Sequence, residues 1–191
     1  MVDQLTSQLN VPVSMIRDDL NDIPQYDLPV DYSFEWYLKG YEKYWTVIQK
    51  ATDKFNDITD KLFYDEFGDN SRLLFQRQCY VFYKNQTVGT ATAWFNNNYK
   101  GMPFGRLHWV AIEPTHQGLG ISKPLLTTVC EKMRRLGHKR VYLTTSSIRI
   151  PAINLYLKFG FQPEITNQGD LGIWLSIQEK LKYPLNLVQL F

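Results

Sequence analysis

Apolar residues recur along the chain at two periods, and their order predicts a mixed α/β protein. Large apolar and polar residues alternate over 32–37, which predicts a half-buried strand. Spacings of three and four residues predict helices from Tyr41 to about Asp53 and from Thr59 to Phe67. The residues before them lack a regular period, apart from a short edge strand suggested at 11–16.

The middle of the chain predicts a hairpin followed by a buried strand. β-branched and aromatic residues fill 79–83 and 87–95, and a short polar segment between them predicts a turn. Small residues share one face of the second arm, which lets a helix pack closely. Residues 96–102 are expected to form a loop, and the apolar run 107–112 predicts a strand near the middle of a sheet.

The last third alternates helices and strands. We expect a helix over 122–136, a strand over 140–145 and a short helix from Pro151 to Gly160. Residues 161–163 and 172–178 are then expected to be strands. This order predicts an α+β fold with three layers, α/β/α, and a mixed, mostly antiparallel central sheet rather than a doubly wound parallel sheet.

Composition narrows the class of protein. The 191 residues, 44% of them hydrophobic, suit an N-terminal arm, 1–30, and a single domain, 31–191. A net charge of +2 gives no reason to expect a nucleic-acid partner. The sequence shows neither a secretory signal nor a membrane-spanning apolar run. Cys79 and Cys130 are interpreted as free buried thiols, so we expect a cytoplasmic protein without a membrane partner.

The segment from Val110 to Ser122 carries the chemistry. A strand ends at Pro114, a loop with Gly118 and Gly120 follows, and a helix begins at once. Backbone N–H groups converge at such a junction, and the helix dipole adds partial positive charge, which suits a phosphate or pyrophosphate. The alternative is a tight turn without a ligand. A dinucleotide site is less suitable, because the third glycine and the acidic residue after the next strand are missing.

Two motifs stand out in the second half of the chain. The first is Gln117-x-x-Gly120-x-Ser122, and the second is Ala152–Phe161, with Leu-Tyr followed by Gly-Phe. The first is similar to the acetyl-CoA loop, and the second to the C-terminal motif, of the Gcn5-related N-acetyltransferase superfamily, in particular of its small bacterial-type members. The resemblance covers about residues 88–163. It implies acetyl-CoA as co-substrate and a central strand that splays from a parallel neighbour. No metal is expected, because the three histidines show no metal-ligand spacing.

The resemblance also implies which residues hold the cofactor. Ser122 stands where the superfamily has Gly or Ala, and Arg149 stands where it often has Asn, so Asn154 is a candidate to take over that contact. The pantetheine arm is expected on the backbone of the central strand, and the pyrophosphate on the loop. The implied cofactor-binding residues are Val110, Ile112, Gln117, Gly118, Leu119, Gly120, Ile121, Ser122 and Asn154.

Two side chains are candidates for proton transfer. His108 lies on the strand that leads into the loop, and its ordinary pKa of about 6.5 suits a base; the alternative is a structural histidine. Arg106 stands where histone-modifying relatives place a glutamate. The resemblance makes Tyr156 the general acid that protonates the CoA sulfur, and the alternative is a packed core tyrosine.

The acceptor is the least determined part of the prediction. The aromatic residues between Trp36 and Trp45 are predicted either to line a pocket for an aromatic or cationic amine or to take part in ordinary packing. The acidic residues at 57–66, Glu66 included, are interpreted first as a solvated helix face. We expect an N-acetyltransferase acting on a small primary amine. Two alternatives stay open: a sensor that binds acyl-CoA without catalysis, and a protein or peptide N-acetyltransferase. The choice between a monomer and a homodimer is also open.

Overall fold

The computed structural model describes residues 10–185 and 187, and these form two compact units. The central unit is Leu20–Lys139. The terminal unit combines Met1–Asp19 with Arg140–Phe191. Within the described residues, no helix reaches the length and apolarity needed to cross a membrane.

The central unit contains a four-stranded antiparallel sheet. Its strands follow the order β2-β3-β4-β5. Their bounds are Tyr32–Trp36 for β2, Gln78–Tyr83 for β3, Gln86–Tyr99 for β4 and Met102–Ile112 for β5. The predicted loop over 96–102 was wrong, because β4 and β5 continue as a hairpin closed by Lys100 and Gly101, both at positive φ. The end of this hairpin is partly exposed, so it does not need the apolar alternation by which a strand is recognised.

Three helices cover one face of this sheet. The bounds are Glu42–Thr52 for α1, Asp60–Phe67 for α2 and Ser71–Phe75 for α3. Their buried side chains, Trp45 and Phe63 among them, form one cluster with Tyr80 and Phe82 of β3. The short helix α3 was not predicted; it begins where the Asn70 side chain accepts a hydrogen bond from the backbone N–H of Leu73.

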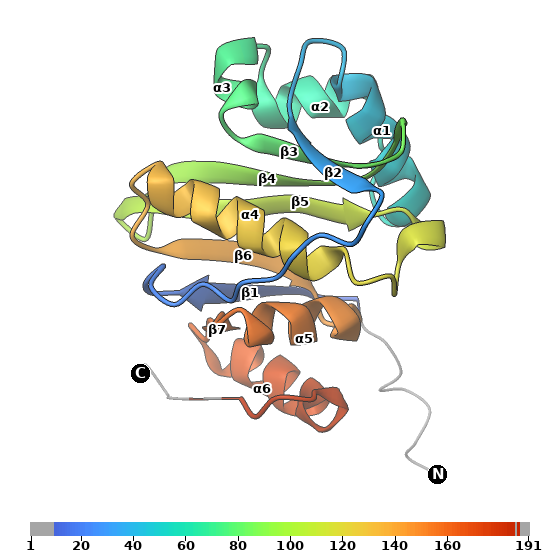
Figure 1. Ribbon diagram of the computed structural model, residues 1–191. Coiled ribbons are helices and arrows are strands. Elements are labelled where there is room, and N and C mark those ends of the chain that lie inside the picture. The colour runs from blue at the N-terminus through green and yellow to red at the C-terminus, as the bar shows by residue number, and fades with distance from the viewer. Residues whose placement is uncertain (1–9, 186, 188–191) are drawn as a thin grey trace. The chain divides into compact units, whose positions relative to one another are not determined.

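Helix α4, Ser122–Arg135, lies on the other face and gives the central unit its three layers. Figure 1 shows α4 across the front of β4 and β5. Gly89, Ala91 and Ala93 lie at alternate positions of β4, as the sequence predicted for a strand that a helix approaches closely. The 3₁₀ turn η1, Pro114–His116, joins β5 to the loop before α4.

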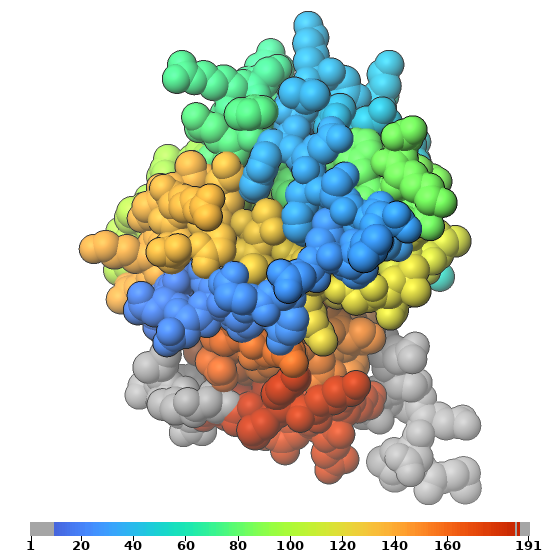
Figure 2. Space-filling view, viewed as in Figure 1, coloured from blue at the N-terminus to red at the C-terminus, as the bar shows by residue number. Residues whose placement is uncertain are grey.

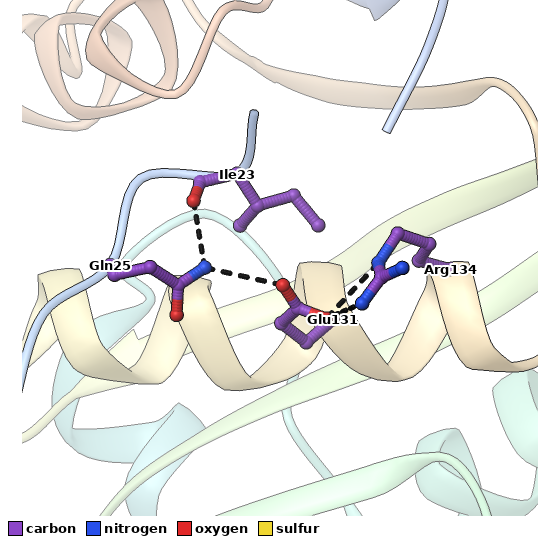
Figure 3. Close-up of polar contacts among 4 residues, drawn as sticks. All are labelled: Ile23, Gln25, Glu131 and Arg134. Carbon is purple, nitrogen blue, oxygen red and sulfur yellow. Dashed lines mark hydrogen bonds and ion pairs between the residues drawn. The ribbon is translucent and has the colours of Figure 1, made fainter. Parts of the chain in front are cut away.

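The segment before β2, around residues 23–25, contacts α4 through hydrogen bonds. Gln25 donates from Nε2 to the carbonyl oxygen of Ile23 and to Glu131, whose other oxygen accepts from Arg134 (Figure 3). The Thr127 hydroxyl donates to the carbonyl oxygen of Pro24 at 2.7 Å. In Figure 2 the blue segment that precedes β2 accordingly lies against the yellow surface of α4. These contacts orient the segment along the helix that begins at the glycine loop.

The terminal unit contains three strands that pair antiparallel in the order β6-β1-β7. The bounds are Pro12–Arg17 for β1, Val141–Ser146 for β6 and Gln162–Pro163 for β7. The strand suggested at 11–16 therefore exists, but it has a partner on both sides instead of lying at an edge. Helix α5, Ile150–Lys158, is joined to β1 by Arg17, which donates to the carbonyl oxygen of Phe159.

The predicted strand over 172–178 was wrong. Helix α6 occupies Gln168–Ile177, and the 3₁₀ turn η2 follows at Gln178–Lys180. The helix begins at Asn167, whose side chain accepts from the backbone N–H of Asp170, and the Asp170 carboxylate accepts from Thr166 in return. A side-chain cap of this kind supplies acceptors that the first helical turn lacks, and it outweighs the apolar run that suggested a strand.

The predicted antiparallel pairing is confirmed inside each unit, and the predicted three layers are confirmed in the central unit. The expected splaying of the central strand from a parallel neighbour stays a prediction. The division into an arm, 1–30, and a domain, 31–191, also stays one; residues 1–9 lie outside the described residues.

Candidate functional site

The glycine loop has the backbone that an anion site needs. Gly118 and Gly120 have φ of +75° and +82°, values that L side chains rarely adopt. A Cβ built on either glycine meets no atom within 4 Å, so the space in front of the loop is open. Gly118, Leu119 and Gly120 are exposed, whereas Ile121 behind them is buried and anchors the start of α4.

Five consecutive backbone N–H groups, from Gly118 to Ser122, have no acceptor among the hydrogen bonds of the described residues. No side chain caps α4, and its first turn has no acidic residue. The first turn instead carries Lys123, whose ammonium lies 5.3 Å from the centre of the Tyr26 ring. A cation near a helix N-terminus is unfavourable by itself, because the helix dipole is positive at this end. Lys123 and the free N–H groups together therefore favour binding of an external anion.

Gln117 closes the loop onto the preceding strand. Its Nε2 donates to the carbonyl oxygen of Ile112 at 2.9 Å, which ties the first loop residue to the last residue of β5. Val110 is half-buried, and Leu119 exposes 53% of its surface to solvent. The structure thus brings the predicted loop residues together with the end of β5, in one unit.

A bulge interrupts β5 just before the loop. The register between β4 and β5 shifts between Thr90 and Thr92, and Trp109 has φ of +49°. Successive side chains of a regular strand point to opposite faces, but here His108 and Trp109 contact the same residue of α2. Gln49 of α1 donates to the Trp109 carbonyl oxygen at 3.1 Å and holds the bulge from the same face.

The shared partner is Glu66. Its Oε2 lies 2.6 Å from His108 Nε2 and accepts from Trp109 Nε1 at 3.2 Å. The His108 side chain is 10% exposed and that of Glu66 is 30% exposed. A half-buried carboxylate therefore reaches the buried imidazole and still has contact with solvent.

Charge in this pair is distributed unevenly. The hydrogen bond from His108 lowers the pKa of Glu66 below its ordinary value, and Trp109 and Arg106 act in the same direction. Burial lowers the pKa of His108, and Arg106 adds to this, while Glu66 opposes it. The pair at neutral pH is accordingly a carboxylate beside a neutral imidazole.

Glu66 is a functional candidate, although the sequence predicted a solvated helix face for the acidic residues at 57–66. A signal was present, because Glu66 follows Leu62 by four residues and Phe63 by three, which places it toward the apolar face of α2. The bulge at Trp109 had no such signal: its residues are ordinary for a strand, and only the pairing of β4 with β5 shows it.

The two remaining predicted site residues belong to the terminal unit. Tyr156 on α5 is 7% exposed, and burial raises its pKa to about 12 although Arg149 lowers it. Asn154 donates from Nδ2 to the carbonyl oxygen of Ile150, and its Oδ1 accepts from the backbone N–H of Lys182 at 2.7 Å. Asn154 thus fastens the chain after η2 to α5, and its role toward a cofactor stays a prediction.

The aromatic residues expected near the acceptor divide into two groups. Trp45 and Tyr37 are buried in the cluster between α1, α2 and the sheet, which agrees with the packing alternative. Tyr41 donates to Glu35, and Tyr44 exposes 41% of its surface beside it, with 5.0 Å between the two ring centres. Trp36 belongs to neither group: it is half-buried, and the Lys132 ammonium lies 4.0 Å from its ring centre.

The chain resembles known acetyltransferases in sequence. The model of the Acetyltransferase (GNAT) family matches residues 24–161. N-acetyltransferase 8B of Rattus norvegicus is 41% identical over 81 residues, which are 40% of this chain and 35% of that protein. The chain spans less than half the length of the curated relatives it matches.

Solved structures share the fold. A GCN5-related N-acetyltransferase from Sphaerobacter thermophilus aligns with a TM-score of 0.66 at 18% identity, over 80% of this chain and 48% of that one. The ribosomal-protein-S18-alanine N-acetyltransferase of Escherichia coli aligns with a TM-score of 0.58 at 18% identity, over 71% of this chain and 79% of that one. The family model covers most of the chain and includes both the glycine loop and the motif around Tyr156. The chain belongs to the acetyltransferase (GNAT) family.

Proposed function

We propose that the protein is an N-acetyltransferase that uses acetyl-CoA and acts on a primary amine. The observation that carries this proposal is the loop from Gly118 to Ser122, with five free N–H groups, two glycines at positive φ and no acid in the following helical turn. Bound acetyl-CoA supplies an activated acyl group whose thioester carbon is attacked by the amine.

The loop residues fit the pyrophosphate of CoA. Open space in front of Gly118 and Gly120 admits the phosphate oxygens to the N–H groups, and Lys123 adds positive charge. We place the pantetheine arm on the backbone of Val110 to Ile112. The bulge leaves Val110 without a partner on β4, whereas Ala111 and Ile112 pair with Thr90 and Gly89. The Ile112 carbonyl already accepts from Gln117, so the acceptors and donors left for the arm are those nearer Val110.

Proton transfer requires a base and an acid. A primary amine enters as an ammonium, because its ordinary pKa is near 10.4, and it must lose a proton before it attacks. We assign this proton to His108, which passes it to water. As the C–N bond forms and the C–S bond breaks, Tyr156 delivers its proton to the sulfur. The nitrogen loses a second proton to water, and Tyr156 takes a proton back from water, which restores its hydroxyl. The products are the amide, the CoA thiol and one released proton.

The acceptor class rests on the family and on the charge of the site. The names of the relatives describe N-acetylation, which requires an amine, and the one carboxylate beside His108 suits a cation. The Escherichia coli neighbour is named for the alanine of a ribosomal protein, which is the reason to test a protein or peptide acceptor as well. A small amine and a peptide N-terminus are therefore the two acceptors to compare.

Two measurements test the proposal. Binding of CoA is followed by calorimetry, and thiol release from acetyl-CoA is followed with 2-phenylethylamine, spermidine and a peptide that begins with alanine. We expect CoA to bind and at least one amine to accelerate thiol release. Binding without acceleration by any amine would favour a sensor of acyl-CoA, and absence of CoA binding would remove the proposal.

A further inference from the structure

The contact between His108 and Glu66 determines which nitrogen of the imidazole is basic. A carboxylate only accepts hydrogen bonds, so the 2.6 Å contact requires a proton on His108 Nε2. Burial keeps the ring neutral at pH 7, so its second nitrogen, Nδ1, has no proton and holds the lone pair. The tautomer follows from the hydrogen-bond network.

Glu66 is itself held in place. Its helix begins at Thr59, whose hydroxyl accepts from the backbone N–H of Leu62. Phe67, the next residue, is buried, and its ring centre lies 5.7 Å from that of His108 and 5.8 Å from that of Trp45. The second hydrogen bond to Glu66, from Trp109, exists only because the bulge turns this side chain toward α2.

Few charges face the imidazole. Glu66 approaches from α2, and Arg106 lies two residues away on β5 itself. Helix α1 contributes the uncharged Gln49 at the adjacent bulge, and β4 places the uncharged Thr92 opposite His108. Glu66 is thus the one acidic group among the described residues that acts on His108, against burial and Arg106.

We propose that Glu66 is a positioning residue that fixes His108 as the Nε2–H tautomer and presents Nδ1 as the nitrogen that takes the proton of the acceptor. This inference rests on the proposed function. When Nδ1 takes the proton, the N–H bond of the ammonium breaks and its electron pair stays on the amine. The resulting imidazolium then forms an ion pair with Glu66 through Nε2–H, which lowers the energy of the charged ring. Release of the Nδ1 proton to water restores the starting state.

The decisive measurement needs no acceptor. The ¹⁵N shifts of the His108 ring, followed by NMR against pH in the free protein, report both the tautomer and the pKa. We expect protonated Nε2 in the wild type. Glu66→Gln keeps the shape and an acceptor oxygen but removes the charge, so we expect it to lower the pKa of His108 by about one unit or more, the size typical of an adjacent opposite charge.

Asp65→Asn is the matched control. Asp65 precedes Glu66 on the same helix, but it is 54% exposed and pairs with Lys61. Removal of this charge is expected to leave the tautomer and the pKa of His108 nearly unchanged. A wild-type ring protonated on Nδ1, or a Glu66→Gln protein with the wild-type pKa, would overturn the proposal.

Kinetics separate this proposal from the function on which it rests. With the most active amine, the ascending limb of the pH–rate profile is expected to move to lower pH in Glu66→Gln, with a reduced plateau, and to disappear in His108→Gln. If the limb persists in His108→Gln, His108 is not the base and the proposed proton transfer fails. If His108→Gln removes the limb but Glu66→Gln does not move it, only the role of Glu66 fails.

Discussion

At the scale of single residues, burial determines how each candidate group behaves. His108 and Tyr156 are both buried, but burial lowers the pKa of the first and raises that of the second, because in each case it disfavours the charged form. His108 is thereby neutral and Tyr156 fully protonated at neutral pH. These are the states in which a base accepts a proton and an acid donates one.

Tyr156→Phe tests the acid. The substitution keeps the ring and removes the hydroxyl, so we expect turnover to fall about 10²-fold while CoA affinity changes little, because a proton donor acts on the transition state. With the pKa of Tyr156 near 12, full transfer to a thiolate is uphill, and most of the effect comes from a hydrogen bond to the developing charge. Turnover is measured by thiol release under single-turnover conditions.

Tyr142→Phe provides the comparison for that variant. Tyr142 is also buried in the terminal unit and lies on β6 instead of α5. Its variant is expected to retain near-normal turnover. Equal turnover of both variants and the wild type would show that Tyr156 is not the general acid and serves only in packing.

At the scale of elements, the junction between β5 and α4 has two separate irregular features, a β-bulge and a glycine loop. The bulge at Trp109 turns two neighbouring side chains to one face, and the glycines after Gln117 expose five N–H groups. The bulge interrupts the hydrogen bonds of β5 shortly before Ile112, and the free N–H groups begin directly after Gln117. The helix and strand on each side keep their ordinary geometry and hold the interruptions in place.

Gly120→Leu tests the loop. We expect it to abolish CoA binding in calorimetry, because the side chain enters the open space before the N–H groups and the residue resists a positive φ. Gly137→Leu is a matched control: Gly137 follows the other end of α4, has φ of +84° and also faces open space. Both variants are expected to lose about 1–2 kcal/mol of stability, but only the first should lose CoA. Unchanged affinity in Gly120→Leu would show that the site is misplaced.

At the scale of the whole molecule, buried and half-buried ionisable groups couple the free energy of unfolding to pH. Burial lowers the pKa of His108 and of His138, so between the ordinary value near 6.5 and the folded-state value the unfolded chain binds protons that the folded protein does not. Stability therefore falls as pH drops below about 6.5. The lowered pKa of Glu66 adds stability that is present above the ordinary carboxyl pKa and is lost as pH falls through the folded-state value.

Urea unfolding at a series of pH values measures this coupling. The unfolding free energy of the wild type is expected to decrease from pH 7 to pH 5, and the slope is expected to be shallower in His108→Gln and in His138→Gln, since each removes one group that the unfolded chain protonates. The slope is the readout, because the first variant also deprives Glu66 of its partner. A slope equal to that of the wild type in both variants would contradict the assignment.

The sequence by itself determined the local features of this protein: the amphipathic helices, the glycine loop with its helix start, and the two motifs that resemble the family. These depend on residues close to one another along the chain, so periodicity and residue type report them directly. The extension of β4 and β5 and the helix α6 were misread where exposure or a side-chain cap replaced the usual pattern. Only the tertiary structure decided that Glu66 meets His108, because 42 residues separate them and their contact depends on the register of β4 with β5 and on the packing of α2. Register and packing are set by many distant contacts at once, and no local pattern contains them.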